Sequence, residues 1–198
     1  MTEKIVAYQR KTSDQRQQDL IEAGIRCLGE GGISNFTINK ICNAANVSRG
    51  LINHHFNTKD DLLLCIYDSM TAYLVKQDED TKIEERVFSI IQKSFDRESF
   101  KKTNLRAWLA IWGQVANNDD LKKLHESRYL QYQQTLSQSI AEIAKQRQLS
   151  VDSMAIARLL IALIDGLWLE YCLHSHSYSL ETAEQDCYRL LENYLGDL

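Results

Sequence analysis

Apolar residues recur every three to four positions along most of the chain, which is the spacing of one face of an α-helix. After a polar arm at residues 1–12, Thr12 and Gln15 have the spacing of a capping box and predict the start of a helix. Gly31 and Gly32 predict its end, because glycine adopts the backbone conformation that commonly follows a helix.

Two short helices are expected next. Thr37 is expected to cap one of them, and Ser48 to cap the other, which runs to about His55. The three-residue turn between them begins at Asn46, and asparagine tolerates the left-handed conformation best after glycine. Two short helices joined by a tight turn and braced by a third helix form a helix-turn-helix.

Six longer helices are expected behind this front part. A capping box at Thr58 and Asp61 opens the first of them, and the charged stretch 76–82 indicates a connection. The others are expected from Ile83 to Ile91, over 105–117, after Asn118, over 152–174 and from Ser179 to Leu195. The pattern therefore predicts an all-α fold of nine helices, three short ones in front of six longer ones.

Composition agrees with this fold class. The 198 residues include no proline and only eight glycines, as expected for a chain that is helical nearly throughout. No apolar run approaches the roughly 20 residues that span a bilayer, and the start of the chain lacks the pattern of a secretory signal. The five cysteines are odd in number and scattered, which is typical of reduced thiols. We therefore expect a cytoplasmic protein.

Charge is distributed unevenly along the chain. The net charge of −4 would by itself disfavour a nucleic-acid partner. Residues 1–60, however, hold eight Lys or Arg and six Asp or Glu, whereas residues 61–198 hold fifteen and twenty-one. This slightly basic front is compatible with DNA binding, and ordinary solvated surface is the alternative interpretation.

The front part also carries a specific motif. Arg49, Asn53 and His54 would project from the second short helix as donors to base edges and phosphates, although an ordinary corner between two helices is the alternative. Residues 37–56 read TINKICNAANVSRGLINHHF, followed by Lys59 and by Leu62 and Leu63. This stretch resembles the signature of the TetR family of bacterial regulators, T-I-x-x-I-A-x-x-A-G-V-S-x-G-x-x-x-H-Y-F-x-x-K-x-x-L-L.

The resemblance implies a homodimer that binds a palindromic operator and responds to a small molecule held by its C-terminal part. It implies a DNA-binding domain over residues 1–58 and a ligand-binding and dimerisation domain over residues 59–198. The expected DNA-binding residues are Thr37, Lys40, Ser48, Arg49, Gly50, Asn53, His54, His55 and Lys59.

Three positions depart from the family pattern. Cys42 replaces alanine and Asn46 replaces glycine, and both replacements are conformationally tolerated. His55 stands where the family has a tyrosine that commonly contacts a phosphate. A histidine ring nitrogen can also donate a hydrogen bond, so a phosphate contact is still possible there.

The back part resembles a narrower group, the choline-responsive repressors of glycine-betaine synthesis. The matching segments are Phe95-Asp96, AWLAIW at residues 107–112 and LIDGLWL at residues 163–169. A quaternary ammonium ion is recognised by aromatic faces and a carboxylate, because it cannot donate conventional hydrogen bonds. Trp108, Trp112, Asp165 and Trp168 are the expected ligand-binding residues.

Simpler interpretations of the same residues stay open. Aromatic residues at helical spacing are often part of a core. The alternative for Asp165 is a pair with an arginine, such as Arg106 or Arg158, or a hydrogen bond from the backbone. Cys172, His174 and His176 include metal-ligand residue types, but no second cluster accompanies them. The chain carries no catalytic triad or phosphate-binding glycine loop, so we expect neither an enzyme nor a cofactor.

The sequence thus predicts a homodimeric repressor that pairs through helices 152–174 and 180–195 and is released from DNA by choline or a related amine. One alternative is a TetR-type regulator of efflux or catabolism with an unrelated apolar ligand. The other is a helical interaction module that no longer binds DNA.

Overall fold

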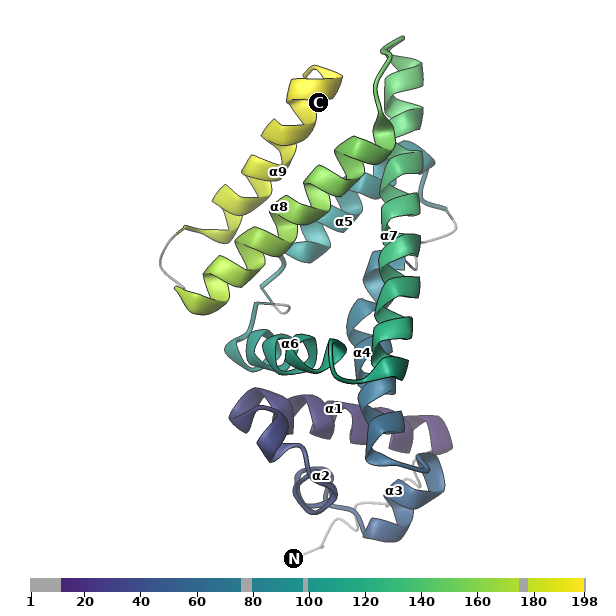
Figure 1. Ribbon diagram of the computed structural model, residues 1–198, viewed down its shortest axis with the longest axis vertical. Helices are drawn as coiled ribbons and strands as arrows, with labels where there is room; N and C mark the ends of the chain where they lie inside the picture. The colour runs from purple at the N-terminus through teal and green to yellow at the C-terminus, as the bar shows by residue number, and fades with distance from the viewer. Residues whose placement is uncertain (1–11, 76–79, 98–99, 175–177, 198) are drawn as a thin grey trace, which may run out of the picture.

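The computed structural model describes residues 12–75, 80–97, 100–174 and 178–197 (Figure 1). These residues form helices and their connections, with no strand, which confirms the all-α fold and the nine helices. The α-helices are α1 (Ser13–Gly31), α2 (Ile38–Ala45), α3 (Arg49–His55), α4 (Lys59–Val75), α5 (Arg86–Ser94), α6 (Lys102–Val115), α7 (Asp119–Gln146), α8 (Ser153–Leu173) and α9 (Leu180–Leu195). Two short 3₁₀ turns, Ile33–Asn35 and Ile83–Glu85, precede α2 and α5.

Most of the expected helix ends are where the sequence placed them. The capping box of Thr12 and Gln15 is formed in both directions, and so is that of Thr58 and Asp61. Asn46 adopts the left-handed conformation, with a φ of 52°, and ends α2. The helix-turn-helix geometry is therefore set by local sequence.

Some local expectations were wrong. Ser48 lies at the start of α3, but its side chain makes no capping hydrogen bond, and the N–H of Leu51 donates to the Ser48 carbonyl instead. The helix expected at 105–117 begins three residues earlier and ends two residues earlier, and the one expected from Ile83 begins as a 3₁₀ turn. The polar arm to residue 11 and part of the connection 76–82 lie outside the described residues.

The helices form a head and a body. Helices α1, α2 and α3 form the head at one end of the molecule, and α5, α8 and α9 lie at the other end (Figure 1). Helix α4 runs from the head into the body beside α7, and α6 lies directly above α1 and packs along it. Only α4 begins in the head and continues into the body, so it is the covalent route between the two ends.

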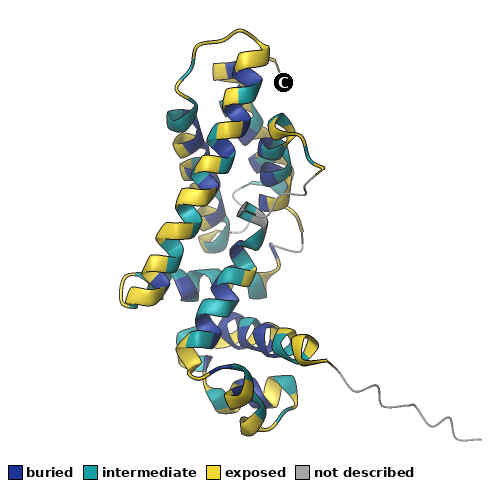
Figure 2. Cartoon of the chain, turned by 90° about the vertical axis from the view of Figure 1, so that its right-hand side faces the viewer, coloured by how far each residue is buried: buried dark blue, intermediate teal, exposed yellow. Residues whose placement is uncertain are grey.

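One of the two buried clusters extends from the head into the body. A buried cluster built mainly from α1, α2 and α4 also includes Ala107 and Ile111 of α6 and Leu121 of α7. The outer face of the head, by contrast, is largely exposed (Figure 2). The expected division after residue 58 coincides with the start of α4, and it stays a prediction.

Helices α1 and α6 approach closely at Gly29. A Cβ atom at this position would lie 2.3 Å from the backbone oxygen of Thr103. We therefore expect Gly29→Ala to lower the free energy of unfolding by about 1–3 kcal/mol, because the helices would have to separate. The measurement is the urea unfolding midpoint.

Gly113, in the interior of α6, is the matched control, because a Cβ atom there meets nothing within 4 Å. Gly113→Ala should raise stability by about 0.5–1 kcal/mol, as expected for a glycine in a helix interior. Equal stability of Gly29→Ala and the wild type would contradict the close α1–α6 packing.

Candidate functional site

Helix α3 presents polar side chains outward at the end of the head. Arg49, Gly50, Asn53 and His54 are exposed, while Ile52 is buried against the head core. His55 is half-buried, and its ring contacts the rings of both neighbours, His54 and Phe56. The exposed donors therefore lie on one accessible face of a short helix, which is the arrangement that reads a DNA groove.

The other expected DNA-binding residues surround α3. Thr37 is exposed, and its hydroxyl accepts a hydrogen bond from the N–H of Lys40 at the start of α2. The ammonium group of Lys40 donates to the side-chain oxygen of Asn35. The Lys59 ammonium lies 5.9 Å from the centre of the Phe36 ring. Ser48 is exposed as well. All nine expected DNA-binding residues thus lie in the head or at its junction with α4.

Three tryptophans meet in the body. The ring centroids of Trp108, Trp112 and Trp168 form a triangle with sides of 5.9 Å each, and the rings are steeply tilted to one another. Trp108 and Trp112 come from successive turns of α6, whereas Trp168 comes from α8. The structure therefore brings together three aromatic residues that the sequence placed on two separate helices.

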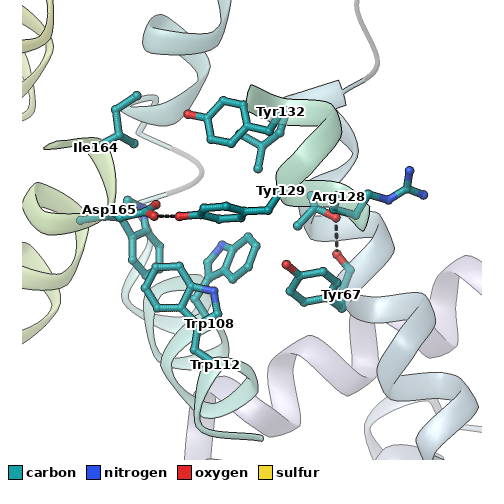
Figure 3. Close-up of a pocket in the computed structure, with 11 residues that line it drawn as sticks. Tyr67, Trp108, Trp112, Arg128, Tyr129, Tyr132, Ile164 and Asp165 are labelled. Atoms are coloured by element: carbon teal, nitrogen blue, oxygen red, sulfur yellow. Dashed lines mark hydrogen bonds between the residues drawn. The ribbon is translucent and has the colours of Figure 1, made fainter. Parts of the chain in front are cut away.

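Asp165 lies beside this triangle, on the turn of α8 before Trp168. Its carboxylate accepts a hydrogen bond from the Tyr129 hydroxyl (Figure 3). Arg106 and Arg158 are both exposed, and neither is its partner. Burial raises the pKa of the Asp165 carboxyl to about 7, because the charged form loses hydration.

Two cavities adjoin the Asp165–Tyr129 contact. An inner cavity of about 40 Å³ has room for a few water molecules. An outer cavity of about 650 Å³ has the size of a small-molecule pocket. Both cavities share Trp112, Tyr129 and Asp165. The inner cavity is also lined by Tyr67, Thr71, Leu74, Trp108, Arg128, Tyr132, Ile164 and Trp168.

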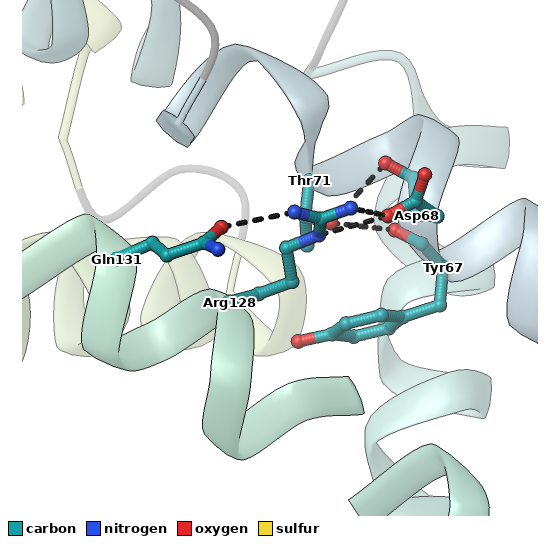
Figure 4. A network of polar contacts seen from close by, with 5 residues as sticks. All are labelled: Tyr67, Asp68, Thr71, Arg128 and Gln131. Atoms are coloured by element: carbon teal, nitrogen blue, oxygen red, sulfur yellow. Dashed lines mark hydrogen bonds and ion pairs between the residues drawn. The ribbon is translucent and has the colours of Figure 1, made fainter. Parts of the chain in front are cut away.

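Polar contacts join α4 to α7 beside the inner cavity. Arg128 donates to the Asp68 carboxylate, with Nε 2.8 Å from Oδ1, and also to Gln131 (Figure 4). A hydrogen bond of 2.7 Å links the Tyr67 hydroxyl to Nδ1 of His125. Burial lowers the pKa of His125 and raises that of Tyr67, which favours the uncharged form of each side chain.

No pattern in the sequence marks Tyr129, His125, Tyr67 or Arg128 as site residues. The four-residue spacing of His125 and Tyr129 places them on one helix face, but α7 carries many residues at such spacing. Which of them meets Asp165 depends on how α7 packs against α8, and no local pattern encodes that packing.

The metal-ligand types noted near the end of α8 form no site in the described part of the chain. No group of three His, Cys, Asp or Glu side chains capable of holding a metal ion occurs there, and His176 lies outside it. Among the described helices, none is long and apolar enough to cross a membrane.

Comparison with protein-family models gives two matches. Residues 20–66 match the model of bacterial regulatory proteins of the tetR family. Residues 83–196 match the model of the C-terminal domain of BetI-type transcriptional repressors. Together the two matches include the helix-turn-helix, the three tryptophans and Asp165.

Individual proteins are similar over nearly the whole chain. HTH-type transcriptional regulator BetI 1 of Chromohalobacter salexigens is 28% identical over 187 residues, which are 91% of each chain. The crystal structure of a transcriptional regulator from Pseudomonas aeruginosa is 30% identical, with a TM-score of 0.79, covering 96% of this chain and 95% of that one. A regulator from Saccharomonospora viridis in complex with choline has a TM-score of 0.73 at 21% identity, covering 93% of this chain and all of the other.

Proposed function

Because this chain belongs to the TetR family of transcriptional regulators, with a BetI-type C-terminal domain, we propose that choline or a related quaternary amine releases it from a palindromic operator. Regulators of this family bind DNA and small-molecule ligands and typically form dimers. Beyond the family's general properties, three features are proposed for this chain: the chemical class of its ligand, the residues that bind the ligand and the two-fold symmetry of its DNA site.

The observation that carries the ligand proposal is the triangle of tryptophans beside a buried acid. Each tryptophan face attracts a cation, and the attraction reaches about 2 kcal/mol in a desolvated site. Asp165 supplies the opposite charge, and its burial strengthens the attraction to a cation. The choline complex of the similar Saccharomonospora viridis regulator supports the same ligand class.

A thermal-shift series tests the ligand class directly. Choline and tetramethylammonium are compared with 3,3-dimethyl-1-butanol, an uncharged analogue of choline. A ligand at about 100 times its Kd stabilises the folded protein by about 2.7 kcal/mol. Stabilisation by the cations alone would support the proposal, and stabilisation by the neutral alcohol alone would favour a regulator with an apolar ligand.

The exposed residues of the head supply the DNA-binding face. Arg49 and Asn53 lie on the outer face of α3, and Lys59 lies at the start of α4, where it can approach a phosphate. Selection of duplexes from a random pool with the purified protein should recover a palindrome. Recovery of no specific sequence would instead favour an interaction module that does not bind DNA.

We expect Arg49→Ala and Lys59→Ala to weaken binding to the selected duplex in different ways. Arg49→Ala should cost about tenfold in affinity and relax the sequence preference, since arginine reads base edges. Lys59→Ala should reduce the slope of log affinity against log salt by about one, the effect of one lost phosphate contact. Fluorescence anisotropy at several salt concentrations measures both effects.

Lys145→Ala provides the charge-matched control. Lys145 is exposed near the far end of α7, in the body, so its replacement removes a positive charge without altering the head. If all three variants bind the duplex with the same affinity and salt slope, the proposed DNA-binding face is wrong.

The exposed face of α8 supports dimerisation. Leu159, Ala162, Gly166, Leu169 and Leu173 are exposed in the single chain and are spaced by three or four residues, so they form one apolar stripe. Leu173 is 71% exposed. We expect this stripe, together with α9, to pack against its copy in a second chain, and a two-fold dimer presents its two recognition helices to a palindrome.

A further inference from the structure

Tyr129 separates the inner cavity from the outer one. Its side chain reaches from α7 toward α8, and its hydroxyl ends on Asp165 (Figure 3). Tyr129 and Asp165 both line each cavity, so their hydrogen bond lies in the wall between them. Trp112 also lines both cavities, so a molecule in the outer cavity meets this tryptophan and the Tyr129–Asp165 contact together.

The Tyr129 ring also contacts a group that leads to the head. It lies against the His125 ring, with centroids 4.8 Å apart and planes inclined by 35°. His125 is also joined to the hydroxyl of Tyr67 by a 2.7 Å hydrogen bond. Tyr67 is only 2% exposed and belongs to α4, the helix that begins directly after the helix-turn-helix.

We propose that Tyr129 is the switch residue of this regulator: a ligand cation displaces its hydroxyl from Asp165, and the displaced ring acts on α4 through His125 and Tyr67. This inference rests on the proposed cationic ligand and adds the step that couples the ligand to the DNA-binding head.

The cavity dimensions favour this displacement. The inner cavity, at about 40 Å³, has room for a few waters but not for a trimethylammonium group with its contacts. The outer cavity is large enough and Asp165 lines it, but the Tyr129 hydroxyl already donates to Oδ2 of the Asp165 carboxylate. A cation that pairs with this oxygen competes with the Tyr129 hydrogen bond.

The direction of the coupling follows from the contacts. Because Tyr129 and His125 lie one turn apart on α7 with their rings in contact, a new position of Tyr129 requires a new position of His125. Movement of His125 alters its hydrogen bond to buried Tyr67, whereas the Arg128–Asp68 pair still ties α7 to α4 nearby. Ligand binding thus changes the His125–Tyr67 hydrogen bond but leaves the Arg128–Asp68 ion pair in place. This unequal change between α7 and α4 can tilt α4 and the head that α4 supports.

The test removes only the Tyr129 hydroxyl. Tyr129→Phe keeps the ring, so it preserves any aromatic contact with the ligand and eliminates the competing hydrogen bond. Calorimetry with tetramethylammonium, which has no hydroxyl of its own, is expected to show about tenfold tighter binding than wild type, the effect of one hydrogen bond to a charged group. A thermal melt of each variant confirms that it is folded.

Tyr188→Phe is the matched control. Tyr188 also donates to a carboxylate, that of Glu184, at 2.8 Å, but it lies on α9 outside both cavities. Its replacement should leave tetramethylammonium affinity unchanged, which excludes a general effect of losing a tyrosine–carboxylate hydrogen bond.

The outcomes separate this inference from the proposed function. Equal or weaker cation binding by Tyr129→Phe, with clear binding by wild type, would overturn the switch and leave the ligand class intact. Absence of cation binding in both proteins would overturn both proposals.

The second half of the path is tested with the selected duplex. Its affinity is measured for wild type and Tyr67→Phe, each without ligand and with saturating tetramethylammonium. Wild type should lose at least about fivefold in affinity when the cation saturates it, which is the lower end of typical allosteric coupling. Tyr67→Phe should lose less, and an equal loss in the two proteins would exclude Tyr67 from the path.

Discussion

Asp165→Asn should weaken choline binding by at least about 30-fold, because the loss of one partner from a buried charge pair costs about 2–5 kcal/mol. The asparagine has nearly the same shape, and its carbonyl oxygen can still accept the Tyr129 hydrogen bond. The substitution therefore removes the charge while preserving the pocket. Binding of 3,3-dimethyl-1-butanol should change little, since this ligand carries no charge, and calorimetry with both ligands measures the contrast.

The pH dependence of the same binding reaction gives an independent check. The carboxyl of Asp165 has a pKa raised to about 7 by burial, and a cation binds its ionised form. Choline affinity should therefore rise about tenfold between pH 6 and pH 8, as the ionised fraction at pH 6 is about one tenth. The affinity of Asp165→Asn should be nearly independent of pH over this range. A flat profile in wild type would show that Asp165 does not bind the cation.

Leu159→Glu should convert the dimer to a monomer and lower operator affinity by about 100-fold or more. Leu159 is 47% exposed in the single chain and lies in the apolar stripe of α8, so a charge there would be buried without a partner in the dimer. A dimer gains affinity because its second head binds at a high effective concentration, and the monomer loses this gain. Sedimentation equilibrium and anisotropy with the selected duplex measure the two effects.

Leu130→Glu serves as the control for this substitution. Leu130 is 54% exposed on α7, outside the α8 stripe, so the same charge should leave both assembly and DNA binding intact. A dimeric Leu159→Glu protein, or a monomeric wild type, would contradict the proposed interface and the expectation of a palindromic operator.

Local signals made much of the fold predictable from sequence. Thr12, Thr37, Asn118 and Ser179 cap their helices through short-range hydrogen bonds that depend only on neighbouring residues. Asn46 ends α2 in the left-handed conformation for the same local reason. The absence of proline and the apolar periodicity then indicated helices almost everywhere.

Ser48 shows where local reasoning fails. Its residue type and position are those of a cap, yet the first turn of α3 closes through backbone groups instead. The hydroxyl of Ser48 is exposed rather than engaged, so it is available to another partner. The capping preference of serine therefore predicts the start of α3 correctly, but it does not predict the hydrogen bonds formed there.

The candidate ligand site was predictable only in part. The resemblance to choline-responsive repressors and the chemistry of quaternary-ammonium recognition indicate Trp108, Trp112, Asp165 and Trp168 as ligand-binding residues. The partner of Asp165 was not identified, because Tyr129 reaches it across the α7–α8 interface, 36 residues away in the chain. The same holds for the contact between Tyr67 and His125, which depends on how α4 packs against α7.

A quaternary amine is expected to release this regulator from DNA. The most direct measurement is fluorescence anisotropy of the selected duplex bound to wild-type protein, titrated with choline and, separately, with 3,3-dimethyl-1-butanol. Choline is expected to dissociate the complex, whereas the neutral alcohol at the same concentrations should leave it bound. Equal release by both compounds, or release by neither, would contradict the account.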